Sequence, residues 1–134
     1  MNTVAPMRIL LIEDDKSFSD TIAEMLELLG YEVVRITALP ASPEDEGFQQ
    51  LVREAGKFDL MIVDEDSITP LGRFKASLGY IQALRENFLG PMIAYSGQAT
   101  NRLLQVFAGC DDGIRGKNIP KLVKVVEELL PITA

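Results

Sequence analysis

Histidine is absent from this chain of 134 residues, and cysteine occurs only once, as Cys110. Without histidine the protein cannot use a Ser/His or Cys/His dyad, the commonest general base, or a histidine-ligated metal. A single cysteine excludes an internal disulfide and a cysteine-cluster zinc site, and it is typical of a reducing compartment such as the cytoplasm. Any chemistry must therefore use carboxylates, hydroxyls, amines and a bound metal ion.

Long hydrophobic runs are also missing, so no membrane span is expected, and the first residues lack the pattern of a signal peptide. Basic residues number 13 against 20 acidic ones, which gives a net charge of −7. This balance disfavours nucleic acids and anionic membranes as partners and favours small cations and basic protein surfaces. A hydrophobic fraction of 47% suits one core. We therefore expect a single domain over residues 1–134, with 1–6 as a disordered extension.

Short aliphatic runs alternate with segments of helical periodicity along the chain. Strands are predicted at residues 9–12, 31–36, 60–63, 92–95 and around Ile114. The helices between them are predicted to end at Gly30, to begin at Ser42 and Pro43, to cover 81–88 and 103–107, and to open at Pro120. This alternation predicts an α/β fold with a doubly wound parallel sheet, helices on both faces, and ligands beyond the carboxyl ends of the strands.

Acidic residues follow two of these strands. Glu13 and Asp14 come after the first, and Asp64 comes after the third. These two strands are neighbours in a doubly wound sheet, so the carboxylates should converge. Two such charges roughly 4 Å apart repel by about 4 kcal/mol at an effective dielectric of 20, which a cation or a raised pKa must offset. An all-oxygen cluster suits Mg²⁺ or Mn²⁺. Alternatively, Asp14 or Asp15 could simply cap the next helix.

Four segments, in this order, resemble the receiver domain of two-component response regulators. They are Arg8–Asp15 (RILLIEDD), Phe58–Asp64 (FDLMIVD), Pro91–Gly97 (PMIAYSG) and Ala108–Asp112 (AGCDD). The resemblance covers nearly the whole chain. It implies a flavodoxin-like (βα)5 fold, with five parallel strands in the order 2-1-3-4-5.

The resemblance also implies roles for individual residues. Asp64 would accept a phosphoryl group from a sensor histidine kinase or a His-containing phosphotransfer protein. Glu13, Asp14, Asp64 and the backbone carbonyl of Asp66 would hold Mg²⁺, and Ser96 would bind a phosphate oxygen. Enzymatic activity would be limited to phosphorylation and dephosphorylation of the chain itself.

Signalling is expected to occur by docking on another protein, through a surface of the fourth helix, the fifth strand and the fifth helix. No DNA-binding or enzymatic module is expected after the last helix. We expect a cytoplasmic monomer or weak dimer.

The fifth strand departs from the receiver pattern. The family's phosphate-contacting lysine falls on Gly116, and Lys117 comes one position late, which in a strand turns a side chain to the opposite face. The family's aromatic switch residue falls on Gly113, which has no side chain to rotate. The loop at 71–78 is longer than usual, and its basic residues are candidates for a substitute cation: Arg73 and Lys75.

Two other functions follow from these observations. A pseudo-receiver would keep the fold and signal without phosphorylation, as Gly113 and Gly116 suggest. A metal centre like that of topoisomerase-primase enzymes could use Glu13 with the run Asp64-Glu65-Asp66. The net negative charge argues against that third hypothesis, because such an enzyme acts on nucleic acid.

Overall fold

The computed structural model describes residues 6–13, 15–37, 44–64, 82–96, 112–115 and 118–132, with only the backbone of 64, 94–96 and 112–115. The elements are, in chain order, β1 (Arg8–Ile12), α1 (Lys16–Leu28), β2 (Glu32–Ile36), α2 (Glu46–Glu54), the 3₁₀ turn η1 (Ala55–Lys57), β3 (Leu60–Asp64), a helical turn at 82–85, β4 (Met92–Ser96), β5 (Asp112–Arg115) and α5 (Ile119–Leu129).

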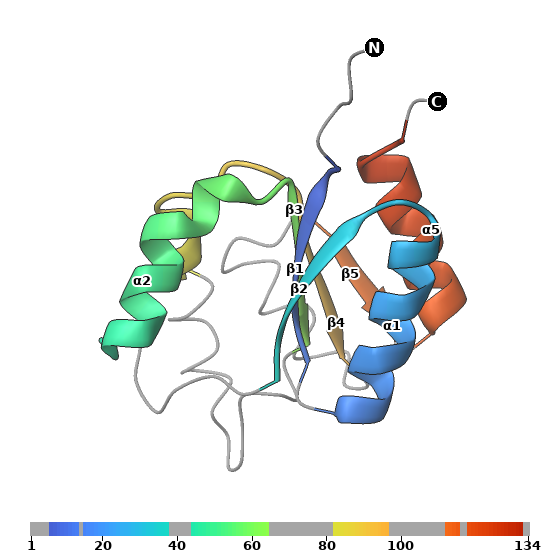
Figure 1. Ribbon diagram of the computed structural model, residues 1–134, viewed down its shortest axis with the longest axis horizontal. Coiled ribbons are helices and arrows are strands. Elements are labelled where there is room, and N and C mark those ends of the chain that lie inside the picture. The colour runs from blue at the N-terminus through green and yellow to red at the C-terminus, as the bar shows by residue number, and fades with distance from the viewer. Residues whose placement is uncertain are drawn as a thin grey trace.

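The five strands form one parallel sheet in the order β2-β1-β3-β4-β5 (Figure 1). This confirms the predicted fold class and strand order, including a fifth strand around Ile114. In the register of the sheet, Ile12 pairs with both Ile36 and Val63, and Asp64 pairs with Tyr95. The carboxyl ends of β1, β2, β3 and β4 therefore lie along one edge of the sheet.

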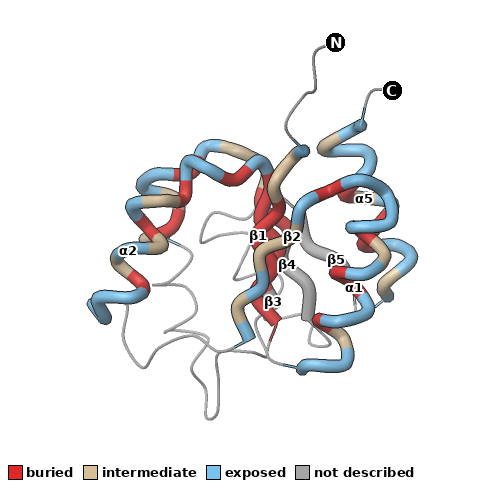
Figure 2. Tube along the Cα trace, in the orientation of Figure 1, coloured by how far each residue is buried: buried red, intermediate tan, exposed pale blue. Residues whose placement is uncertain are grey.

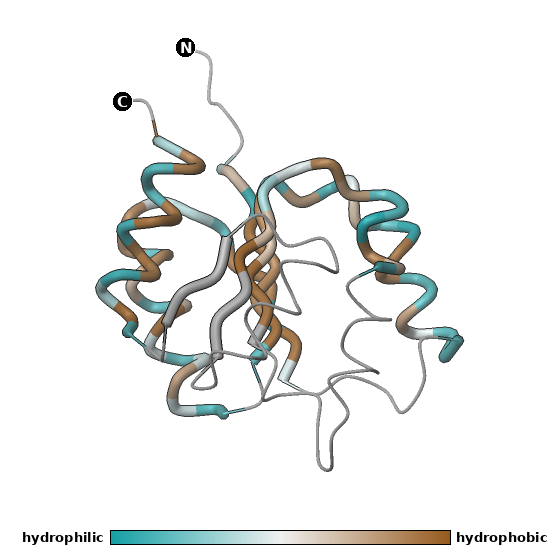
Figure 3. The backbone as a smooth tube through the Cα atoms, turned by 180° about the vertical axis from the view of Figure 1, so that it is seen from behind, coloured by the Kyte–Doolittle hydropathy of each residue, from teal (hydrophilic) through white to brown (hydrophobic). Residues whose placement is uncertain are grey.

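Helices cover both faces of the sheet: α1 and α5 lie on one side, and α2 with the turn at 82–85 lies on the other (Figure 1). Strand residues alternate between the two layers. In β1, Ile9 and Leu11 pack towards α1 and α5, whereas Leu10 and Ile12 pack towards α2. The centre of the sheet is accordingly buried in Figure 2 and hydrophobic in Figure 3. Burial on both faces explains why the strands appear in the sequence as uninterrupted aliphatic runs.

Helix α1 begins and ends as its sequence predicts. The carboxylate of Asp15 accepts a hydrogen bond from the Phe18 amide at 3.2 Å and so caps the first turn. Gly30 follows the helix with a φ of 104°, a left-handed conformation that glycine adopts at little cost. The alternative prediction, that an acid after β1 caps the next helix, is thereby confirmed for Asp15.

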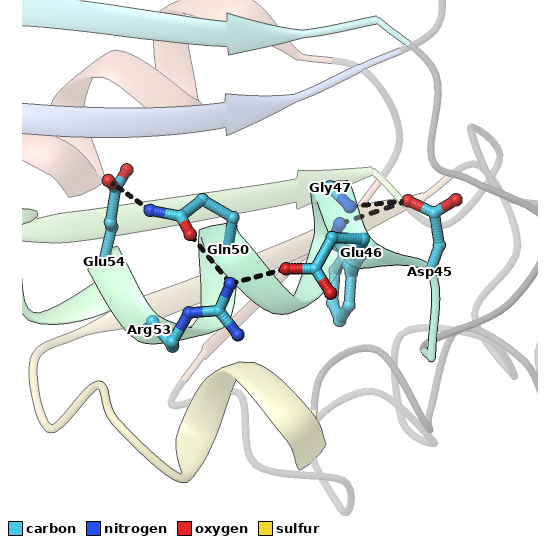
Figure 4. A network of polar contacts seen from close by, with 7 residues as sticks. Asp45, Glu46, Gly47, Gln50, Arg53 and Glu54 are labelled. Carbon is cyan, nitrogen blue, oxygen red and sulfur yellow. Dashed lines mark hydrogen bonds and ion pairs between the residues drawn. The ribbon is translucent and has the colours of Figure 1, made fainter.

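Helix α2 begins later than Ser42 and Pro43 predicted. Its cap is Asp45, whose Oδ1 accepts from the amides of Gly47 at 2.9 Å and Phe48 at 3.3 Å (Figure 4). Helix α5 begins at Ile119, one residue before Pro120, and the Oδ1 of Asn118 accepts from the Lys121 amide at 3.1 Å. Both differences have the same cause, because a side chain that accepts from the first-turn amides fixes the start of a helix.

Several predicted features lie outside the described residues: the extension 1–5, Asp14, Asp66, the loop at 71–78, the helix at 103–107, Cys110, Gly116 and Lys117. Within the part of the chain that is described, no helix has the length and apolar character needed to cross a bilayer.

Candidate functional site

Three of the predicted site residues occupy corresponding positions at the carboxyl edge of neighbouring strands. Glu13 directly follows β1, Asp64 is the last residue of β3, and Ser96 is the last residue of β4. Their strands are adjacent in the order β1, β3, β4. Since Ile12 pairs with Val63, the backbone brings Glu13 and Asp64 to the same level of the sheet, as the strand pattern indicated.

Glu13 is buried completely, with a relative exposure of 0%. Its amide donates a hydrogen bond to the Ile36 carbonyl at 3.0 Å, which extends the pairing of β1 and β2 by one residue. Helix capping does not explain this acid, because Asp15 caps α1. Its complete burial places an acidic side chain inside the protein at the carboxyl edge of the sheet. A cation-binding role for Glu13 stays a prediction.

The donor set expected at this edge consists only of oxygen atoms: carboxylates, a backbone carbonyl and a hydroxyl. This set and the buried carboxylate of Glu13 fit Mg²⁺ or Mn²⁺ and do not fit a metal that requires nitrogen or sulfur ligands. Among the described side chains, no group of three potential metal ligands occurs. The complete ligand set stays a prediction, because it also needs residues outside the described ranges: Asp14, Asp66 and the side chain of Asp64.

Ser19 is a residue that the sequence pattern did not single out. It lies on the sheet-facing side of α1 with Ile22 and Leu26, and it is 0% exposed. Its hydroxyl has no hydrogen-bond partner among the described residues. A signal was present, since Ser19 precedes Ile22 by three positions and Leu26 by seven, on one helical face. It places a polar group inside the α1 layer, in the first turns of the helix that follows Glu13.

Solved structures resemble the chain, although no sequence-family model and no curated protein matches it. A response regulator from Thermotoga maritima superimposes with a TM-score of 0.71 at 18% identity, over 96% of this chain and 100% of that one. A response regulator receiver domain from Methanospirillum hungatei gives 0.69 at 19% identity, over 92% and 93% of the two chains. The chain has the receiver-domain fold.

A third structure with this fold comes from Burkholderia pseudomallei, and its crystals contain a phosphorylated aspartic acid, a calcium ion and citrate. It matches with a TM-score of 0.66 at 21% identity, over 93% of this chain and 67% of that one. At such identities the likeness establishes the fold of this chain.

The fifth strand shows where this chain departs from the receiver pattern. Gly113 lies within β5 and pairs with Ala94, and it carries no side chain. That this is the position of the switch aromatic stays a prediction. Ser96 pairs with Arg115, the last residue of β5. Gly116 and Lys117 follow beyond the described strand, and a contact from Lys117 to the site stays a prediction.

Proposed function

We propose that this protein is a response regulator receiver in which Asp64 accepts a phosphoryl group in a Mg²⁺-dependent reaction. The donor would be a phosphohistidine on a sensor histidine kinase or on a His-containing phosphotransfer protein. This agrees with the absence of histidine from the chain, since the donor imidazole belongs to the partner.

The chemistry requires one nucleophile and the neutralisation of charge. A carboxylate oxygen of Asp64 attacks the phosphorus, a P–O bond forms as the P–N bond breaks, and the imidazole leaves with its electron pair and takes up a proton. The product is an acyl phosphate on Asp64. Ser96 then donates its hydroxyl hydrogen to a phosphate oxygen, which orients the new group.

The divalent cation would be held by Glu13, Asp14, Asp64 and the carbonyl of Asp66. When bound, it neutralises negative charge on the transferring group and on the surrounding acids. The place of Glu13 supports this assignment, because it follows β1 at the level of Asp64 on the neighbouring strand. The Burkholderia structure, which contains a phosphorylated aspartic acid and a calcium ion, is consistent with a divalent cation here.

The observation that carries the proposal is the shared carboxyl edge. In the chain, 51 positions separate Glu13 from Asp64, and 32 separate Asp64 from Ser96. In the sheet, these three residues lie at the carboxyl ends of adjacent strands. A parallel sheet binds ligands at this edge, where strand ends and loops meet. An acid held inside the protein, a second acid and a hydroxyl in this order suit phosphoryl transfer.

The signal would reach a downstream protein through docking, on a surface formed by α5, β5 and the helix predicted at 103–107. A phosphoryl group brings nearly two negative charges, which can reorganise adjacent loops. We place the protein in the cytoplasm, as its single cysteine suggests, and we expect a monomer or weak dimer.

A pseudo-receiver is the second candidate, and Gly113 is the observation in its favour. Because β5 carries glycine beside Ala94, the switch that moves an aromatic side chain inward cannot operate at that position. In this case the protein would bind its partner without phosphorylation, and Asp64 would not accept a phosphoryl group.

Intact-mass spectrometry after incubation with acetyl phosphate distinguishes the two. The proposal predicts one added phosphoryl group with Mg²⁺, none in EDTA, and none in Asp64→Asn. Asp59→Asn is the matched control, because Asp59 lies at the opposite end of β3 and should not affect the adduct. An unmodified wild-type chain under conditions that label another receiver would exclude the phosphoacceptor and leave the pseudo-receiver.

A further inference from the structure

A groove runs between α1 and the edge strand β2, away from the acids of the proposed site. Its volume is about 430 Å³. It is lined by Asp20, Ala23, Glu24, Glu27, Leu28 and Arg35, and we call it the α1–β2 groove. Glu13, Asp64 and Ser96 are not among these residues, so the groove is separate from the proposed phosphorylation site.

The groove exists because of which residues meet there. Ala23, which is only 2% exposed, provides a small side chain where a larger one would fill the space. Arg35 extends from β2 on the same face of the sheet as Val33, which packs towards α1, and it forms an ion pair with Asp20. This ion pair joins β2 to α1 at the groove, and the rest of the lining comes from α1.

The charges that line the groove do not balance. Three carboxylates face a single guanidinium, and that guanidinium is engaged by Asp20. Glu24 and Glu27 form no ion pair with any described residue. They lie three positions apart, so they share one side of the helix and repel each other. The open part of the groove thus presents two adjacent negative charges.

The exposed side of α2 shows the opposite arrangement. There Glu46 pairs with Arg53 at 2.8 Å (Figure 4). Glu54 pairs with Lys57 at 3.8 Å. Arg53 also donates to Gln50, which in turn donates to Glu54. Glu46 and Glu54 of α2 are thus compensated within the chain, whereas Glu24 and Glu27 of the α1–β2 groove are free to pair with a cation from elsewhere.

The α1–β2 groove also has an apolar part next to its negative charges. Leu28, in the last turn of α1, is 80% exposed, and it lines the same groove as Ala23. A hydrated metal ion would not use this leucine, whereas a segment with both basic and apolar side chains would contact the carboxylates and the leucine together.

We propose that the α1–β2 groove docks a basic amphipathic segment of a partner protein, whose Lys or Arg side chains pair with Glu24 and Glu27 and whose apolar side chain covers Leu28. Charge complementarity selects this occupant. A second copy of the chain carries a net charge of −7 and would be repelled, as would a nucleic acid.

The probe is a fluorescein-labelled helical peptide of lysine and leucine, about 18 residues long or roughly five turns, with an aspartate-leucine peptide as the negative control. Fluorescence anisotropy should show binding of the basic peptide alone, weakened by salt. Glu24→Lys/Glu27→Lys should raise the dissociation constant about tenfold, and Leu28→Gln about threefold. Backbone amide shifts caused by the peptide should concentrate on α1 and β2.

Matched variants carry the same chemical changes at exposed positions outside the groove: Glu86→Lys/Glu128→Lys, and Leu89→Gln. These should stay within about twofold of the wild type. Equal weakening by both charge reversals would mean general attraction to an acidic protein and would overturn the proposal. A wild-type dimer in sedimentation that Glu24→Lys/Glu27→Lys dissociates would also overturn it, in favour of self-association.

Discussion

Polar groups serve different purposes at the two ends of the sheet. Where the chain enters the strands, they join segments that are far apart in sequence. The Arg8 amide donates to Asp59 at 2.7 Å, and the Tyr31 hydroxyl donates to the Leu130 carbonyl at 2.6 Å. Where the chain leaves the strands, acids gather instead, with Glu13 buried and Asp64 ending β3. We infer that the amino ends stabilise the fold and the carboxyl ends carry its chemistry.

This separation has a thermodynamic reason. Hydrogen bonds that close long loops add stability, whereas like charges brought together remove it unless a ligand compensates them. A protein can keep such an acidic edge only if the rest of the fold supplies the stability. Variants at the amino ends should therefore change unfolding and leave phosphorylation intact. Variants at the carboxyl ends should change phosphorylation and the response to Mg²⁺.

The largest expected loss of stability comes from Gly90→Ala, just before β4. A Cβ there would lie 2.8 Å from Cζ of Phe88 and 3.0 Å from the Asp59 carbonyl oxygen. The ring is buried and cannot simply move aside, so we expect the free energy of unfolding to fall by about 2 kcal/mol in urea titrations. Gly56→Ala is the control, since its nearest atom lies at 3.5 Å. Equal effects would contradict the steric account.

The next largest loss is expected for Asp59→Ala. It leaves the Arg8 amide without its acceptor, and we expect a loss of about 1.5 kcal/mol by urea unfolding. Asp59→Asn retains a side-chain oxygen and should lose clearly less. The interpretation fails if the two substitutions cost the same.

At the carboxyl edge, Glu13→Gln should weaken the response to Mg²⁺. It removes one proposed ligand, so it should abolish most of the stabilisation, about 1 kcal/mol, that Mg²⁺ gives the wild type. Thermal unfolding with and without Mg²⁺ measures this stabilisation. Glu24→Gln, on the exposed side of α1, should leave it unchanged. A destabilised Glu13→Gln with normal Mg²⁺ dependence would assign Glu13 a structural role instead.

The smallest effect concerns Tyr31, at the amino end of β2. Burial, and then the charge of Glu127, raises the pKa of Tyr31 above its ordinary value of 10.0. The neutral hydroxyl is the form that the fold favours. Its contribution is therefore complete below about pH 10 and is lost as the pH rises through the raised pKa.

We expect Tyr31→Phe to be about 0.5 to 1 kcal/mol less stable than the wild type near neutral pH. This difference should shrink above about pH 10. Urea unfolding across that range measures it. A difference that stayed constant to high pH would show that the Tyr31 hydroxyl contributes no pH-dependent stability.

Much of this architecture could be predicted from the sequence. The aliphatic runs gave the strands, and the acids behind them marked the carboxyl edge, because these signals are local. The caps Asp45 and Asn118 were missed, because Ser42 and Pro120 are equally good signals and only the path of the chain decides between them. Contacts such as Tyr31 with Leu130, 99 positions apart, leave no local signal.

The same limit applied to function. Glu13 could be identified as a candidate ligand from its place after a strand, whereas its complete burial could not. The α1–β2 groove was missed because it depends on Arg35 reaching Asp20 across two elements. Ser19 could have been identified from its helical position, but serine in a buried place contradicts the usual pattern of burial.

The central claim is that phosphoryl chemistry takes place at the carboxyl edge, on Asp64. Borohydride reduces the acyl phosphate that forms after treatment with acetyl phosphate and Mg²⁺, and tandem mass spectrometry then locates the reduced residue. We predict a single reduced residue, Asp64, in the wild type and in folded Gly90→Ala, and a strongly diminished signal in Glu13→Gln. Modification of another residue, or none at Asp64, would contradict the account.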